Sequence, residues 1–391
     1  MAAAFRTDRP SEARNEFRMA AKTAEPASTS AARDDRLMSL DALRGFDMFW
    51  IIGGEGIAQA AAKLTGWAWL AGQLEHPEWH GFKFYDLIFP MFLFMAGVSM
   101  PFSFEKRLAR GDDKSRLTRH VIIRGLMLVL LGTIYNGLLE FKWPDTRLPS
   151  VLGRIGLAYL FAGLIVLNTN WRGQILWIAG LLVGYWAALK FIPVPGFGAG
   201  DLAPGHTLTD FVDRLLIPGR LYRGDRDPEG LFGTIPAIGT ALAGALTGQF
   251  LKNGRRGGYF KTAAMAIVGL VCLGLAHLWN RDFPINKNLW TSSFVLHCAG
   301  WSLLFLALFY FVIDVLRLRR WAFFFIVIGV NPILIYLADR CVDFGYTAHF
   351  FFDGALKHSG RYQPLLWAIA IVAIEWLLLL LLYRKKVFLR V

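Results

Sequence analysis

The stretch FYDLIFPMFLFMAGVSMPFSF, residues 84–104, contains a single charged residue, Asp86. About 20 mainly apolar residues in a helix are enough to cross the hydrocarbon core of a bilayer. Similar runs recur along the chain, and the sequence therefore predicts an all-α, polytopic membrane helical bundle of about ten transmembrane helices. The expected spans are 41–62, 84–104, 118–139, 150–168, 173–192, 231–251, 259–279, 290–314, 321–339 and 364–383.

Composition supports a protein whose main partner is the lipid bilayer. Of the 391 residues, 55% are hydrophobic and only 18% are charged, whereas soluble domains have about 25% charged residues. The net charge of +13 could suggest nucleic acid, but the basic residues form short clusters between the apolar runs, which argues against such a partner. The three cysteines lie far apart in the sequence, so neither a disulfide framework nor a thiolate metal site is expected.

The basic clusters also predict orientation. EKRLARGDDKSRLTR, KNGRRGG, LRLRR and YRKKVFLR fall on one side of a ten-span chain, and cytoplasmic loops are enriched in Lys and Arg. Both termini are therefore expected in the cytosol, with the connections around 63–83, 193–230 and 340–362 on the opposite face. Residues 1–36 have no apolar core of a signal peptide and are expected to be a disordered cytosolic tail before a membrane domain over 37–391.

Ionisable residues inside the expected spans are candidates for function, because charge is costly in the membrane and usually faces the bundle interior. They are Asp47, Glu55, Asp86, Arg124 and Arg154. Arg124 also fits a structural pair or a side chain that reaches the cytosolic surface, and Arg154 fits a structural pair as well as a ligand contact. Glycines and prolines interrupt several spans, which predicts a cavity inside the bundle.

The polar run EHPEWH, residues 75–80, directly precedes the second span. His76 and His80 have an i, i+4 spacing that suits zinc on a helix, but Pro77 places His76 before any helix, and no metal is expected. A single histidine acting as a general base is the alternative, beside a plain loop residue. Trp79 fits an interfacial aromatic belt as well as a sugar-stacking platform.

Two further stretches before spans contain polar groups. Asp227 and Glu229 precede the sixth span and fit either helix capping or contact with a polar substrate. Lys287 and Asn288, in NKNLW, could bind phosphate or sugar hydroxyls, or donate to an oxyanion. Asn331, followed by Pro332, is a candidate for lining the cavity.

Taken together, several motifs resemble the heparan-α-glucosaminide N-acetyltransferase-like membrane proteins. The motifs are SLDALRG, HPEWHGFKFYDLIFPMFLFMAG, VLGRIGLAYL, DPEGLFGTIPAIG, NKNLW and, more loosely, GVNPILIY. They occur in the family's order from about residue 37 to the end of the chain. The resemblance implies transfer of an acetyl group from cytosolic acetyl-CoA to an amino sugar on the opposite face.

The same resemblance assigns candidate roles. It places the family's functional histidine at His76, whereas His80 falls where the animal enzymes have an amide. Glu55 falls near a family asparagine beside the acetyl group, so an acid replaces an amide there. Phosphates of acetyl-CoA call for basic side chains, for which Arg124 and Arg154 are the intramembrane candidates.

The sequence thus predicts an N-acetyltransferase of a bacterial inner membrane, since the chain lacks the large lumenal extension expected of an animal lysosomal enzyme. His76 would act either as a base for the acceptor amine or as an acetylated intermediate. The acceptor is expected to be an amino sugar or glycan, and a homodimer is the default assembly. An amino-sugar permease is the alternative, although no internal repeat supports it.

Overall fold

The computed structural model describes residues 37–389, so the predicted tail over 1–36 lies outside the described residues. The described chain is helical, without a β-strand, which confirms the predicted all-α class. In chain order the elements are α2 (Met38–Phe49), η2 (Trp50–Gly54), α3 (Glu55–Thr65), α4 (Ala68–Gln73), η3 (Phe84–Leu87), α5 (Ile88–Leu108), α6 (Lys114–Tyr135), η4 (Leu138–Glu140), α7 (Val151–Asn168), α8 (Trp171–Phe191), α9 (Leu208–Leu216), α10 (Thr234–Lys252), α11 (Gly258–Trp279), α12 (Ser292–Tyr310), η5 (Phe311–Val315), α13 (Ala322–Gly329), α14 (Pro332–Cys341), α15 (Phe344–Leu356), η6 (Gly360–Tyr362) and α16 (Gln363–Arg384).

Within residues 37–389, eight helices are long and apolar enough to cross a membrane. A ninth span results if α13 and α14, which are bent by 70° across their break, are counted together. About ten spans were expected, and the one that is not found among these helices is the first, 41–62. The stretch over 41–62 is helical, but it is interrupted and carries several charges.

The interruption in the first predicted span is a π-helical turn, η2, in which Gly53 has a φ of 144°. This backbone conformation is open to glycine and strained for other residues. Such π-helical turns are frequent at functional sites. The turn separates α2 from α3, which begins at Glu55.

Close helix pairs are built around small residues. A Cβ on Gly97 of α5 would lie 2.1 Å from the carbonyl oxygen of Ala241 on α10, and one on Gly244 would lie 2.0 Å from that of Phe94. Helices α2 and α13 approach in the same way at Gly45 and Gly329. Because lipid removes the hydrophobic drive between helices, membrane helices associate through such close packing.

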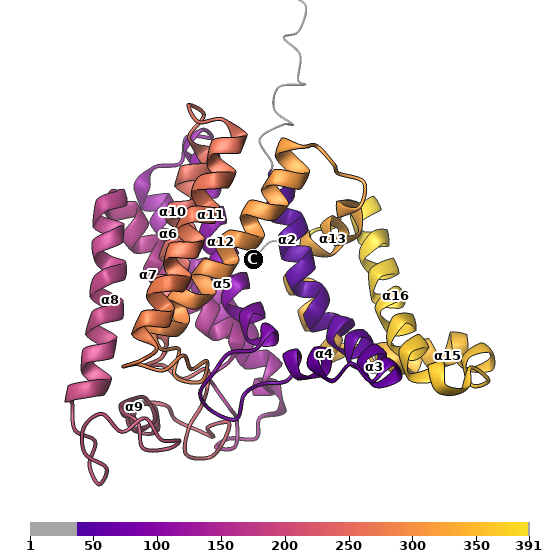
Figure 1. Cartoon of the computed structure of the whole chain (residues 1–391), viewed down its shortest axis with the longest axis horizontal. Helices are drawn as coiled ribbons and strands as arrows, with labels where there is room; N and C mark the ends of the chain where they lie inside the picture. Colours follow the sequence, from indigo (N-terminus) through magenta and orange to yellow (C-terminus); the bar gives the residue numbers. More distant parts are fainter. Residues whose placement is uncertain (1–36, 390–391) are drawn as a thin grey trace, which may run out of the picture. The chain divides into compact units, whose positions relative to one another are not determined.

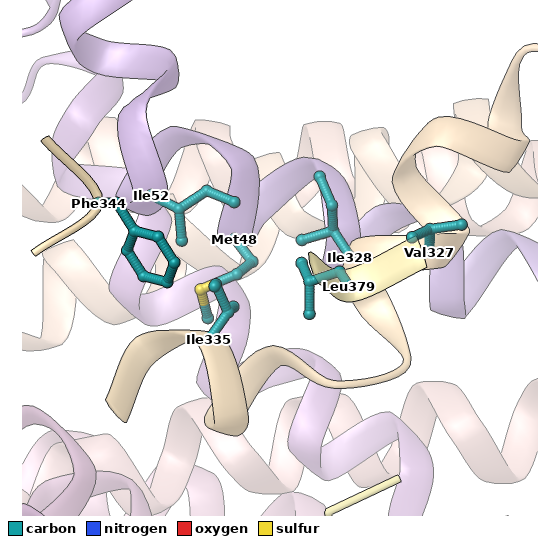
Figure 2. Packing of buried hydrophobic residues seen from close by; sticks show 7 residues of the cluster. All are labelled: Met48, Ile52, Val327, Ile328, Ile335, Phe344 and Leu379. Atoms are coloured by element: carbon teal, nitrogen blue, oxygen red, sulfur yellow. The ribbon is translucent and has the colours of Figure 1, made fainter. Parts of the chain in front are cut away.

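A cluster of buried apolar side chains joins α2 and η2 to the C-terminal helices. Figure 2 shows Met48 and Ile52 meeting side chains from α13, α14, α15 and α16. The members from those helices are Val327, Ile328, Ile335, Phe344 and Leu379. This cluster packs against one face of the α2–η2 segment, and Trp50 of η2 packs edge-on against Phe84 of η3, with 5.0 Å between the ring centroids.

The connections gather at two ends of the bundle. The "site end" holds the connections 74–83, 136–150, 192–233 and 280–291, and it is the end at which α3, α4 and α9 are drawn in Figure 1. The indole of Trp79 donates to the carbonyl of Leu202 there, at 2.8 Å. The "basic end" holds 109–113, 253–257 and 316–321, with Lys252 and Glu105 paired at 2.8 Å.

Three expected loops contain helices. The connection over 63–83 contains α4, the long connection over 193–230 contains α9, and the expected loop over 340–362 contains the 13-residue helix α15. In α9, Thr207 and Asp210 form a capping box, a local signal that was not read from the sequence. The bend before α14 replaces the single span expected over 321–339 and follows the Asn331–Pro332 step.

Candidate active site at the site end

The segment that carries His76 is held in place by the distant 280–291 connection. The amide N–H of Gly81 donates to the carbonyl of Ile285 at 2.8 Å, and the buried side-chain amide of Asn286 donates to the carbonyl of Trp79 at 2.9 Å. Nearer in sequence, the N–H of Phe84 donates to the Gln73 side chain. The segment between α4 and η3 is thereby fixed although it has no regular secondary structure.

His76 is paired with the first acidic residue of the following helix. Its Nδ1 lies 2.6 Å from Oδ1 of Asp86, whose side chain is 1% exposed while that of His76 is 52% exposed. The other oxygen of Asp86 accepts the backbone N–H of Lys83 at 3.0 Å. Since the carboxylate binds Nδ1–H, Nε2 carries the lone pair and is the nitrogen available for chemistry.

Lys287 completes this group from the connection before α12. Its Nζ lies 3.4 Å from Nε2 of His76 and 3.4 Å from Oδ1 of Asp86. Asp86 caps the start of η3 by accepting the backbone N–H of Lys83. Its second role, orienting His76, is visible only in three dimensions.

His80 has a different environment from His76. Its Nδ1 accepts a hydrogen bond from the Asn286 amide at 3.2 Å, and burial lowers its pKa. His80 therefore holds the loop as a neutral side chain. In residues 37–389 no three His, Cys, Asp or Glu side chains come together as a metal site.

Glu55 reaches the same region from the break in the first helix. Its carboxylate accepts a hydrogen bond from the side-chain amide of Gln59 at 2.8 Å and interacts electrostatically with Tyr85. The Tyr85 ring lies beside that of His76, with 5.5 Å between centroids. The structure thus brings Glu55 and His76 to one place through Tyr85, which sequence reasoning did not single out.

Asp227 and Glu229 are engaged by an arginine that was also missed. Arg147 forms a two-point ion pair with Asp227, at 2.6 and 2.7 Å, and contacts Glu229 with the same guanidinium. Asp227 also accepts the backbone N–H groups of Tyr222 and Glu229. Burial opposes the charge of Arg147, but the two carboxylates raise its pKa. These contacts make the acidic pair a brace for the 192–233 connection, and none of them involves a substrate.

The two intramembrane arginines occupy different positions. Arg154 is 1% exposed, donates to the carbonyl of Gly230 at 2.8 Å and lies over the ring of Trp290, 5.1 Å from its centroid. Its Nε and Nη1 have no partner among the described residues. Arg124 lies in the middle of α6, with its guanidinium over the ring of Tyr159, and is not part of the His76 group.

The sequence of the chain matches a known protein family. The family model described as "Heparan-alpha-glucosaminide N-acetyltransferase, catalytic" matches residues 36–279, which is more than half of the chain. The chain belongs to this family. The resemblance inferred from the sequence motifs is therefore confirmed. The matched residues include Glu55, His76, Asp86 and Arg154, whereas Lys287 lies just beyond them.

Two curated relatives extend the similarity. The heparan-alpha-glucosaminide N-acetyltransferase of Homo sapiens is 28% identical over 426 residues, which cover 92% of this chain and 60% of the human protein. That of Mus musculus is 27% identical over 427 residues, covering 93% of this chain and 63% of the mouse protein. The chain thus spans less than two thirds of the length of either relative.

The remaining predicted site residues of this family member lie apart from His76 or have other contacts. Asn331 is 1% exposed, and its amide donates to the carbonyl of Val387 and accepts the N–H of Leu389, at 2.9 Å each. It thereby ties the break before α14 to the C-terminal segment. Asn288 is half-buried beside Lys287. Trp79, through its bond to Leu202 and with the Arg226 guanidinium over its ring, anchors the 192–233 connection. Their roles toward ligands stay predictions.

Proposed function

We propose that the protein is a membrane-embedded acetyltransferase that moves the acetyl group of acetyl-CoA to the amine of an amino sugar or glycan at the site end. The observation that supports this most strongly is the 2.6 Å contact between His76 and Asp86, next to the Lys287 ammonium. A half-exposed histidine oriented by a buried carboxylate is a general-base arrangement. Family membership supports acyl transfer to a glucosaminide amine.

The chemistry requires a base because an ammonium group has no lone pair with which to attack a thioester. Nε2 of His76 takes one proton from the acceptor ammonium, and the Asp86 carboxylate stabilises the imidazolium that forms. The amine then forms the N–C bond as the C–S bond breaks. The second nitrogen proton goes to the sulfur, so the products are the amide, CoA thiol and one released proton. When bound, acetyl-CoA supplies the activated acetyl thioester.

Lys287 has a place in the same step. The negative charge on the thioester oxygen grows as the amine attacks, and a donor fixed nearby stabilises it. Nζ of Lys287 lies 3.4 Å from both Nε2 of His76 and Oδ1 of Asp86, so it could donate to the oxygen of a thioester carbonyl that meets His76. Asn288, next in sequence, is a second candidate donor.

The charges at the two ends of the bundle support a direction of transfer from the basic end to the site end. Connections at the basic end contain Arg255 and Arg256, and also Arg317, Arg319 and Arg320, which favours the cytosol for that end. The site end would then face outward, toward the periplasm if the chain resides in a bacterial inner membrane. The site end has arginines of its own in the long 192–233 connection, where the charge rule has little force.

The test uses purified protein in liposomes, with acetyl-CoA on one side and glucosamine on the other. We expect acetylated sugar to form with the wild type, to be lost in His76→Ala and to persist in His80→Gln, the matched control. Sugar that crosses unmodified in the absence of acetyl-CoA would instead support the permease. Full activity in His76→Ala would refute the proposed site.

A labelling experiment distinguishes the base from a covalent intermediate. Protein incubated without acceptor, with acetyl-CoA that carries a label in its acetyl group, should retain no label after denaturation if His76 acts as a base. Label retained by the wild type and absent from His76→Ala would show that the histidine accepts the acetyl group, and would contradict direct transfer.

A further inference from the structure

Asp47 of α2 is a buried carboxylate without a partner. Its side chain is 0% exposed, and neither oxygen has a hydrogen-bond partner among residues 37–389. Three positions later, the indole Nε1 of Trp50 is also buried and has no acceptor. Two acceptor atoms at the end of α2 and one donor at the start of η2 are therefore without hydrogen-bond partners, three positions apart.

Both side chains are directed to the same side of the helix. Trp50 packs edge-on against Phe84 of η3, and Asp47, three positions earlier in the helical segment, lies on the same face as Trp50. Met48 and Ile52, on another face, pack against the C-terminal helices, as seen in Figure 2. The unpaired groups thus face the elements that hold the His76 site.

A free carboxylate inside a membrane bundle is unfavourable unless a partner reaches it. Burying a polar group without a hydrogen bond is costly, and a charge more so. Ionisable groups in membrane spans are accordingly rare and mark ligand or ion pathways. Met48 and Ile52 make the apolar contacts to the C-terminal helices, and no described residue gives the Asp47 oxygens a hydrogen bond.

The level of Asp47 along the helix indicates which ligand it meets. Eight residues separate it from Glu55, which corresponds to about 12 Å of helix, and Glu55 contacts Tyr85 beside His76. Asp47 therefore lies deeper in the bundle than the reacting groups, on the way to the basic end. A thioester donor that reaches His76 from the basic end has to pass this level with its long arm.

We propose that Asp47 and Trp50 bind the amide groups of the pantetheine arm of acetyl-CoA. The arm offers N–H and hydroxyl donors to the Asp47 oxygens and amide carbonyl oxygens to the Trp50 indole, which matches the unpaired atoms in kind. This assignment rests on the proposed function, because it takes acetyl-CoA as the donor. It adds a contact that holds the arm in the membrane interior and so delivers the thioester to His76.

The test measures binding rather than turnover. Purified protein in nanodiscs is titrated with acetyl-CoA by calorimetry, for the wild type, Asp47→Leu and Trp50→Phe. We expect the dissociation constant to rise at least tenfold in Asp47→Leu and severalfold in Trp50→Phe. Glu375→Gln is the matched control, since Glu375 is a buried acid of α16 that also has an unpaired oxygen, and its affinity should equal that of the wild type.

Thermal unfolding of the same samples separates a ligand contact from a structural one. Replacing a buried acid that has no partner by leucine should leave the melting temperature unchanged or raise it. Weaker binding with unimpaired stability supports the inference.

Each other result has a definite meaning. No binding of acetyl-CoA to the wild type would refute the proposed function itself. If Asp47→Leu binds acetyl-CoA with the wild-type affinity, this inference is overturned, but the proposed function is not. If that variant also loses turnover, Asp47 would be assigned to proton transfer. An equal loss of affinity in Glu375→Gln, or a large loss of stability in Asp47→Leu, would show a general effect on the bundle and would also overturn it.

Discussion

Replacing Asp86 by asparagine should slow acetyl transfer without loosening the fold. Asparagine can still accept the Lys83 N–H, so the start of η3 is preserved. What disappears is the negative charge 2.6 Å from Nδ1 of His76. Hydrogen bonds to charged groups contribute about 1.5–3 kcal/mol, and each 1.36 kcal/mol in the barrier is tenfold in rate. We therefore expect kcat to fall about 10- to 150-fold.

The assay is acetylation of glucosamine by protein in liposomes, with kcat and the KM for acetyl-CoA determined separately. The KM for acetyl-CoA should stay near the wild-type value, because Asp86 acts on the transition state through His76. A purely structural role would instead lower the melting temperature and change both constants. Asp86→Glu, which restores the charge, should recover part of the rate.

The decisive comparison is the double variant. If Asp86 works mainly through His76, then adding Asp86→Asn to His76→Ala should cause a much smaller loss than it causes in the wild type, because residues that act as a unit are not additive. A small remaining loss is expected from the lost contact between Asp86 and Lys287. The reasoning is refuted if the two losses multiply, or if Asp86→Asn alone retains the wild-type kcat.

Three further predictions concern stability, each read from thermal unfolding. Burial raises the pKa of Asp213 to about 6, so the folded protein is stabilised when this side chain is protonated. This contribution to the free energy of unfolding is fully present below about pH 4 and is lost as the pH rises through 6; it amounts to about 3 kcal/mol. The stability of Asp213→Asn relative to the wild type should therefore increase from pH 4 to pH 7, and a difference in stability that does not change with pH would contradict this. Arg147→Met leaves two carboxylates unpaired and should cost about 3–5 kcal/mol, whereas unchanged stability would mean that the brace is dispensable. Gly97→Val should lower the free energy of unfolding by about 1–3 kcal/mol because the added side chain overpacks against α10. Gly184→Val is the control and should be tolerated, because a Cβ at Gly184 meets nothing within 4 Å.

Helix type and approximate position could be predicted from apolar length alone, because lipid leaves the backbone no alternative to the helix in this chain. The breaks were harder. Glycines at 53 and 54 signalled an interruption, but nothing in the sequence distinguishes a π-helical turn from a kink. In the 340–362 stretch, the helix α15 is rich in exposed aromatic residues such as Phe350 and Phe351 and has no amphipathic pattern that would separate it from a loop.

The candidate site shows a similar division. His76 could be selected from its motif, and Lys287 from a polar run before a span, but their meeting could not be predicted, since 211 positions separate them. Asn286 and Asn288 look equivalent in NKNLW. Only the structure shows that Asn286 is the buried one, at 0% exposure, and that it holds the loop of His76. Arg147 stood unremarked in a short loop because its partners lie 80 and 82 positions away.

This distribution makes the C-terminal part of the chain a component of the site. The family match ends at residue 279, yet the loop of His76 is held by the Ile285 carbonyl and the Asn286 amide, and its charge partner is Lys287. Farther on, residues of α13 to α16 pack against Met48 and Ile52. A fragment ending at residue 279 would contain His76 and Asp86 but lack the contacts that fix their geometry. Misplacement by about 1 Å can reduce a rate by about 100-fold, so the matched region by itself should not support efficient transfer.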